Sequence, residues 1–302
     1  AAAPPPPERR VALLVAGLGS TSENGAIDDV DAEGLGYDAP DVLRFSYEGG
    51  RTPDPTDGWT AIEPAAYDAA DSQIDLRTSG ARLADLIEEV AELSPGTPID
   101  LYAHSQGGLV TRLALVELEA RHGERWLSRL GLVATLGTPH GGADLATAVY
   151  AVGSTRAGSL VLDGAQHVLG IPLDDDAPSS RQLAESSDVI QELADSPIPP
   201  TVRSVSIAAR GDLVVPVPRT AAPGATEVVV PLIGPSAHDA LPGSAEAGRE
   251  LALALAGLPP TCQSLGSALA DQLVGEGISL GEDALGALGW FAGASRGMPF
   301  SG

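Results

Sequence analysis

Lysine is absent from this chain, so all 17 of its basic residues are arginines, set against 41 aspartates and glutamates. The formal net charge of -24 repels phosphate backbones and anionic bilayers. Nucleic acid is therefore excluded as an expected partner. Electrostatic docking on anionic membranes is excluded as well. The remaining interpretation of the charge is that it keeps the protein soluble.

Cysteine is almost absent as well, because Cys262 is the only one. An intrachain disulfide is impossible, which excludes a disulfide framework but leaves secretion open. No stretch of about 18 uncharged apolar residues occurs, so we expect no transmembrane helix. The proline-rich start, residues 1–10, is either a short flexible segment or the mature end left by signal-peptide cleavage. The second interpretation predicts a secreted, extracellular protein.

Aromatic residues are scarce, at 4%, so a core must be built mainly from Ala, Val, Leu and Ile. Short apolar runs typical of buried strands alternate with apolar residues at helical spacing. The expected strands are 11–16, 42–47, 99–103, 130–136, 202–208 and 226–230, and the expected helices include 72–93 and 245–255. Such alternation predicts an α/β fold with a mostly parallel sheet covered by helices on both faces.

Two segments interrupt this alternation. Residues 143–200 carry helical patterning without a convincing strand, and we expect them to form a helical cap or lid inserted into a main domain that spans residues 11–258. Residues 259–302 carry two short amphipathic stretches, which we expect to pack back on the domain as a helical tail.

The most informative segment is 99–110, where a short apolar run leads into Ser105 and two glycines precede an apolar helical pattern. This layout is typical of a nucleophile elbow, in which the serine lies on a sharp strand-to-helix turn. The turn needs small residues two positions before and after the serine. Gly107 meets this need, and Ala103 replaces the usual glycine while still leaving room. Ser105 is therefore the candidate nucleophile.

A serine nucleophile needs a base, and the base needs an orienting carboxylate. In this architecture the acid and then the histidine follow the serine along the chain. Asp212 follows the strand expected at 202–208, and His238 follows the strand expected at 226–230. Because loops after parallel strands gather at one edge of the sheet, we expect both to meet Ser105 there.

His238 is the only one of the five histidines that combines the right chain order with a position after a strand. The others adjoin the nucleophile, end a helix, precede the acid or fall in the insertion: His104, His122, His140 and His167. Among the carboxylates, Asp239 is too close to His238 to orient its ring. Asp212 is preferred for its position after a strand.

Negative charge that develops on a substrate oxygen needs backbone N–H donors. The N–H of Gln106, directly after the nucleophile, is one candidate. The loop after the first strand, Gly17-Leu18-Gly19, offers the N–H of Leu18 as the second. The alternative interpretation of Gly17 and Gly19 is an ordinary tight turn.

Three segments carry a family resemblance: Ala103–Gly108, Leu136–Gly142 and Gly211–Pro216. The first resembles the elbow of α/β-hydrolase lipases and esterases. The second resembles the Gly-Thr-Pro-His-x-Gly segment of bacterial lipases and of relatives that deacylate glycosylphosphatidylinositol, and the third resembles the acid loop of the same group. The resemblance spans residues 11–257 and implies the α/β-hydrolase fold.

By this resemblance Ser105 carries over as the nucleophile, Asp212 as the orienting acid and His238 as the base. The chain departs from many lipases of the family at Ala16, where they have histidine before the glycine of the oxyanion loop. The backbone donor at Leu18 survives this change.

His104 and His140 are candidates for the wall of a substrate pocket. For His140 the favoured alternative is a structural hydrogen bond beneath its loop. The sequence thus predicts a serine carboxylic-ester hydrolase that acts on small-molecule or lipid esters with apolar acyl groups and needs no metal or organic cofactor. The alternatives are an acyltransferase that uses the same acyl-enzyme and a non-catalytic binding protein on this scaffold.

Overall fold

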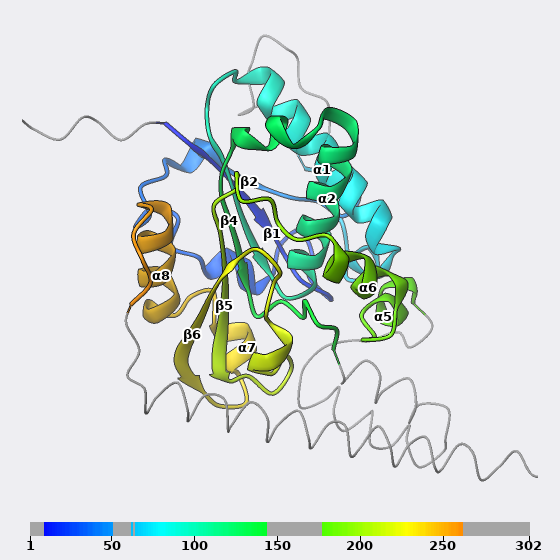
Figure 1. Ribbon diagram of the computed structural model, residues 1–302, viewed down its shortest axis with the longest axis vertical. Coiled ribbons are helices and arrows are strands. Elements are labelled where there is room, and N and C mark those ends of the chain that lie inside the picture. The colour runs from blue at the N-terminus through cyan, green and yellow to red at the C-terminus, as the bar shows by residue number, and fades with distance from the viewer. Residues whose placement is uncertain (1–8, 51–61, 63, 144–176, 262–302) are drawn as a thin grey trace, which may run out of the picture.

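The structure is a computed structural model that describes residues 9–50, 62, 64–143 and 177–261 (Figure 1). Six strands form one sheet in the order β2-β1-β3-β4-β5-β6, and every neighbouring pair is parallel. The strands are β1 Val11–Val15, β2 Val42–Arg44, β3 Ile99–His104, β4 Leu130–Leu136, β5 Ser204–Gly211 and β6 Thr226–Ile233. This architecture confirms the predicted α/β fold with its parallel sheet.

Helices cover both faces of the sheet (Figure 1). They are α1 Leu76–Leu93, α2 Gln106–His122, α5 Pro178–Gln182, α6 Asp188–Asp195, α7 Ala237–Ala240 and α8 Ala245–Leu255, with 3₁₀ turns that include η1 Ala26–Asp29, η4 Asp71–Gln73 and η5 Glu124–Arg129. Side chains alternate across each strand, so Leu13 packs into the core with α1 and α2, while Leu14 packs on the opposite face with α8. The sheet therefore has a hydrophobic core on each of its two faces.

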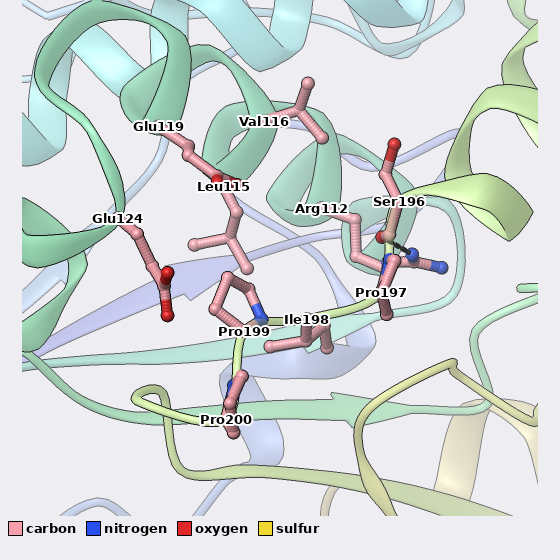
Figure 2. A pocket seen from close by; sticks show the side chains of 10 residues that line it. All are labelled: Arg112, Leu115, Val116, Glu119, Glu124, Ser196, Pro197, Ile198, Pro199 and Pro200. Atoms are coloured by element: carbon pink, nitrogen blue, oxygen red, sulfur yellow. Dashed lines mark hydrogen bonds between the residues drawn. The ribbon is translucent and has the colours of Figure 1, made fainter.

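The segment 177–200 is anchored to the helices on one face. In α6, Val189 and Leu193 are fully buried in the core that contains α1 and α2. Arg112 of α2 donates to the backbone carbonyls of Leu193 and, at 2.6 Å, of Ser196, both at the end of α6 (Figure 2). A guanidinium at a helix C-terminus complements the partial negative charge of the free carbonyls. These residues therefore belong to the body of the domain.

Residues 144–176 of the expected insertion and residues 262–302 of the expected tail lie outside the described residues, so the cap and the tail stay predictions. Cys262 and His167 also lie outside them. None of the described helices is long and apolar enough to cross a membrane. The extracellular location likewise stays a prediction.

Candidate active site

Ser105 occupies the sharp turn between β3 and α2. Its φ of 54° makes it the one non-glycine residue with positive φ in the described part of the chain. Its N–H donates to the carbonyl of Leu136 at 2.9 Å, and its own carbonyl accepts from Gly108 at 3.0 Å. A non-glycine residue in this region is strained, and the neighbouring bonds hold it there. The local geometry is that of the predicted nucleophile elbow.

Close packing around the elbow explains the small residues beside it. A Cβ at Gly107 would lie 2.5 Å from the carbonyl oxygen of Val15 and 2.6 Å from that of Ala16. A Cβ at Gly17 would lie 2.8 Å from the Cβ of Ser105. The start of α2 is thus pressed against the end of β1. Ala103 is fully buried, so the structure accommodates a methyl group where elbows usually have glycine.

Asp212 and His238 form a buried hydrogen-bonded pair at the same edge of the sheet. The Nδ1–H of His238 donates to Oδ2 of Asp212 at 2.7 Å. The other carboxylate oxygen accepts the backbone N–H groups of Val214 and Val215 at 2.8 and 2.9 Å. Asp212 directly follows β5, and His238 lies in α7, which follows β6. With Nδ1 carrying the hydrogen, Nε2 is left as the basic nitrogen.

The electrostatics of the pair favour a basic histidine. Burial lowers the pKa of His238, but the charge of Asp212 and its hydrogen bond raise it, and the net effect is a pKa above the ordinary value. A histidine that gains basicity from a carboxylate partner accepts a proton more readily. The pair can therefore act as a general base.

Gly137 connects the pair to the elbow. Its neighbour Leu136 accepts the N–H of Ser105, and a Cβ at Gly137 would lie 3.2 Å from both Cε1 and Nδ1 of His238. The same Cβ would lie 3.4 Å from Oδ2 of Asp212. Ser105, Asp212 and His238 thus all lie next to Leu136 or Gly137, at the carboxyl end of β4.

Among the described residues, no hydrogen bond joins the hydroxyl of Ser105 to His238. Nε2 of His238 is buried and has no hydrogen-bond partner among the described residues. Ser105 is partly exposed, so its hydroxyl is accessible. Hydrogen bonds of this kind are often long or absent without substrate and tighten in the complex.

His104 contacts His238 directly. It is buried, its Nε2–H donates to the carbonyl of His238 at 3.0 Å, and the two rings are 4.6 Å apart. Burial and the neighbouring His238 lower its pKa well below the ordinary value, despite the hydrogen bond to the backbone. A neutral His104 has one N–H, and that N–H holds His238 in place.

His140 is also buried, and its Nε2 lies 3.0 Å from Oγ1 of Thr135. It is a structural hydrogen bond, which was the favoured alternative for His140 from the sequence. Burial, and secondarily the charge of Arg112, lower its pKa well below the ordinary value. A neutral, buried His140 supports the loop after β4 from beneath.

The two predicted oxyanion donors lie on segments that are braced by other residues. The N–H of Leu18 makes no hydrogen bond within the described chain, and Gln106 at the first position of α2 has no intrahelical acceptor for its N–H. The N–H of Gly19 donates to Oγ of Ser72 at 2.8 Å, and Nε2 of Gln106 donates to the carbonyl of Ser72 at 2.6 Å. Ser72 thus ties the loop after β1 to the start of α2.

Sequence reasoning missed the supporting residues of this loop. Ser72 was expected at the start of a long helix, and its contacts with Gly19 and Gln106 cross 53 and 34 positions. The hydroxyl of Tyr47 donates to the carbonyl of Ala16 at 2.7 Å. None of these three bonds leaves a local signal in the sequence, because each depends on how distant segments pack.

In the part of the chain that the structure describes, one group of three side chains could hold a metal ion by distance alone. The ligand atoms of His104, His238 and Asp239 lie within 4.8 Å of one another. His238 already donates to Asp212 through Nδ1, and Nε2 of His104 is bonded to a carbonyl. A metal on Nε2 of His238 would occupy the nitrogen that a serine nucleophile needs. These hydrogen bonds suit a histidine that acts as a base better than a set of metal ligands.

Comparison with known proteins agrees with this geometry. Residues 60–175 match the family model described as "Putative serine esterase (DUF676)". The matched segment includes Ser105 and Gly137 and ends before Asp212 and His238. No curated protein matches the chain in sequence.

Several solved structures share the fold. The mature form of lipase BlEst2 from Bacillus licheniformis is 19% identical, with 83% of this chain and 94% of that chain covered and a TM-score of 0.54. Aspergillus fumigatus lipase B is 13% identical over 93% of this chain and 62% of that chain, with a TM-score of 0.52. A lipase-esterase related protein from Clostridium acetobutylicum is 11% identical over 84% of this chain and 96% of that chain, with a TM-score of 0.50.

The sheet order and these likenesses show that the chain has the fold of α/β-hydrolases. The match of residues 60–175 to the serine esterase family model supports a serine ester hydrolase.

Proposed function

We propose that this protein hydrolyses carboxylic esters of apolar acyl groups through an acyl-enzyme formed on Ser105. The observation that carries the proposal is the buried Asp212–His238 pair, which packs against Gly137, while the preceding residue Leu136 accepts the N–H of Ser105. The lipases and esterases among the structural relatives support the substrate class.

The proposed reaction begins with a rotation of the Ser105 hydroxyl toward Nε2 of His238. The serine oxygen attacks the ester carbonyl, and Nε2 takes the serine proton. Asp212 stabilises the imidazolium that forms, because its carboxylate accepts the Nδ1–H. The backbone N–H groups of Leu18 and Gln106 stabilise the oxyanion.

The second half of the reaction mirrors the first. His238 gives its proton to the leaving alcohol, and the acyl group stays on Ser105. A water molecule then attacks the acyl-enzyme while His238 accepts its proton. His238 returns that proton to the oxygen of Ser105 as the bond to the acyl carbon breaks, which releases the carboxylic acid and restores the free serine.

Replacement of the nucleophile tests the proposal. Ser105→Ala should abolish hydrolysis of p-nitrophenyl esters, since no group remains to form the acyl-enzyme. Thermal unfolding and circular dichroism should show that the variant is folded. A matched control is Ser128→Ala, because Ser128 is exposed and bonds only to the carbonyl of Arg125. Full activity in Ser105→Ala would contradict the proposal.

A series of esters with rising acyl length would define the substrate. Activity that increases sharply above the solubility limit of the substrate indicates a lipase, and activity that saturates below it indicates an esterase. Addition of an alcohol acceptor separates hydrolysis from acyl transfer, because a transferase would form the new ester in place of the acid.

A further inference from the structure

A cavity of about 360 Å³ opens at the edge of the sheet opposite the candidate active site. Arg10, Arg129 and Arg203 line it, and they directly precede β1, β4 and β5. The active-site residues follow the carboxyl ends of the strands, so the cavity lies at the amino ends. We call it the arginine pocket.

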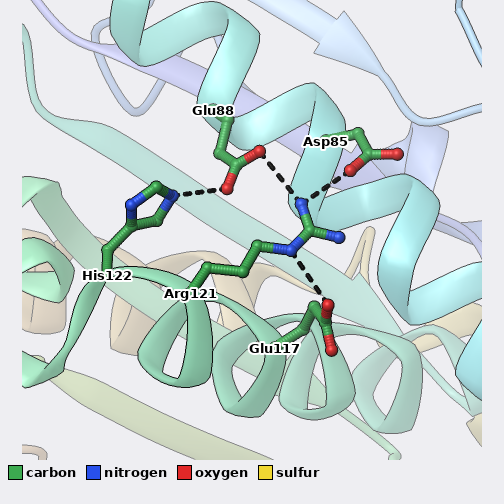
Figure 3. A network of polar contacts seen from close by, with 5 residues as sticks. All are labelled: Asp85, Glu88, Glu117, Arg121 and His122. Atoms are coloured by element: carbon green, nitrogen blue, oxygen red, sulfur yellow. Dashed lines mark hydrogen bonds and ion pairs between the residues drawn. The ribbon is translucent and has the colours of Figure 1, made fainter.

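Within the described residues, two of these arginines have no carboxylate partner, whereas other arginines of the chain do. Arg121 contacts Asp85, Glu88 and Glu117 together (Figure 3). By contrast, no ion pair with a described residue involves Arg129 or Arg203. In a chain with 41 acidic residues and 17 arginines, two neighbouring guanidiniums without carboxylates are a marked local excess of positive charge.

The guanidiniums are held in place while most of their donors stay available. Nη1 of Arg203 donates to the carbonyl of Leu255 at 2.8 Å, at the end of α8. Nη1 of Arg129 donates to the carbonyl of Ala91 at 3.3 Å, and its Cζ lies 5.5 Å from the centre of the Trp126 ring. A guanidinium has five N–H groups, so each retains donors for a ligand.

The other side of the pocket adds hydroxyl groups and a fixed third guanidinium. Arg10 forms a two-bond pair with the buried carboxylate of Asp100, at 2.7 and 2.5 Å, so its charge is balanced. The hydroxyls of Ser94 and Thr97 are 2.8 Å apart and share one hydrogen bond, which leaves one hydroxyl hydrogen to donate. The pocket therefore offers donors from several directions and a net positive charge.

We propose that the arginine pocket binds a small anion that carries a phosphate group, through the guanidiniums of Arg129 and Arg203. A phosphate dianion offers more acceptor oxygens and more charge than a carboxylate, and guanidinium donors match its geometry. The cavity volume fits a small molecule. A nucleic acid is disfavoured because the net charge of -24 would repel a long polyanion.

The test is titration calorimetry of the full chain with inorganic phosphate, at constant ionic strength in a buffer without other multivalent anions. Wild type should bind phosphate saturably at one site. Arg129→Gln and Arg203→Gln should each raise Kd by about tenfold, since a hydrogen bond to a charged group contributes ~1.5 kcal/mol or more. Arg125→Gln is the matched control, because Arg125 is an exposed arginine of η5 that does not line the pocket.

Two separate variants keep the test decisive if one of them folds poorly, and thermal unfolding without phosphate identifies such a variant. Equal Kd values for wild type and a folded Arg129→Gln or Arg203→Gln protein would overturn the proposal, as would no saturable binding. Acetate at matched ionic strength should bind at least about tenfold more weakly than phosphate. Equal affinity for acetate would overturn the assignment to phosphate.

Discussion

At the scale of single residues, the site depends on how His238 is held. Asp212 fixes the hydrogen on Nδ1, His104 holds the backbone carbonyl, and Gly137 leaves the space that the imidazole ring occupies. Each contact restricts one degree of freedom of the ring. The base nitrogen Nε2 is thereby kept free of competing partners within the described residues.

Asp212→Asn should remove the orienting charge and allow the wrong tautomer of His238. We expect kcat to fall by about 10³- to 10⁴-fold with little change in KM, because the carboxylate acts in the transition state. Hydrolysis of a soluble p-nitrophenyl ester measures both constants. Asp239→Asn is the control, since Asp239 is an exposed neighbour of His238. Equal losses in both variants would contradict the assignment of Asp212.

The same pair sets the pH dependence of the reaction. His238 acts as a base only when neutral, so kcat/KM should rise with pH through its pKa, which lies above the ordinary histidine value of 6.5. In Asp212→Asn the charge of Asp212, the largest cause that raises this pKa, is removed, while burial, which lowers it, and the smaller effect of Asp239, which raises it, remain. The acidic limb of the residual activity should therefore move to lower pH. A limb that stays in place would show that another group titrates.

Chain order led to Asp212 and His238, and the structure brings these two side chains together because loops after parallel strands gather at one edge of the sheet. Their catalytic roles stay predictions. Chain order did not lead to the residues that support them. The bond from His104 to the carbonyl of His238 spans 134 positions and depends on the packing of α7 against β3. His104 and His140 are both buried and hydrogen-bonded within the protein, and their place on a pocket wall stays a prediction.

At the scale of elements, prediction worked best where the signals were local. The strand expected at 130–136 and the helix expected at 245–255 have those bounds in the structure. The strand expected at 42–47 ends at Arg44, although Phe45 and Tyr47 are buried, because burial alone does not maintain strand pairing at a sheet edge. The helix expected from 72 begins at Leu76, where the side chain of Asp75 accepts the N–H of Thr78.

The close contact between α2 and β1 gives a prediction at this scale. Gly107→Ala should push the first turn of α2 away from the carbonyls of Val15 and Ala16, where the added Cβ would lie at 2.5 and 2.6 Å. We expect the free energy of unfolding to fall by about 2–4 kcal/mol and esterase activity to fall with it, since Ser105 moves with the helix. Urea unfolding and ester hydrolysis measure the two effects.

Gly248→Ala provides the matched control on another helix. A Cβ at Gly248 in α8 would meet no atom within 4 Å, so alanine should be neutral or stabilise the protein by up to about 1 kcal/mol through its helix propensity. Similar destabilisation of both variants would show that glycine at 107 is not required by the approach of α2 to β1.

At the scale of the whole molecule, the excess of acidic residues opposes folding through repulsion between like charges. Arginine networks offset part of it, and Arg121 with three carboxylates is the densest example in the described chain (Figure 3). Most carboxylates have no such partner available, because 41 acidic residues face 17 arginines. Repulsion should therefore outweigh the attractive pairs, which contribute only about 0–1 kcal/mol each when exposed.

Screening of this repulsion predicts how stability depends on salt. Raising NaCl from about 10 mM to about 300 mM shortens the Debye length from about 30 Å to under 10 Å, so Tm should rise by several degrees. If surface ion pairs dominated, the same salt would lower Tm, so the sign decides between the two effects. KCl should give the same curve, because screening depends on ionic strength and not on the cation. The buffer must contain no phosphate, since a ligand of the arginine pocket would raise Tm by binding the folded state.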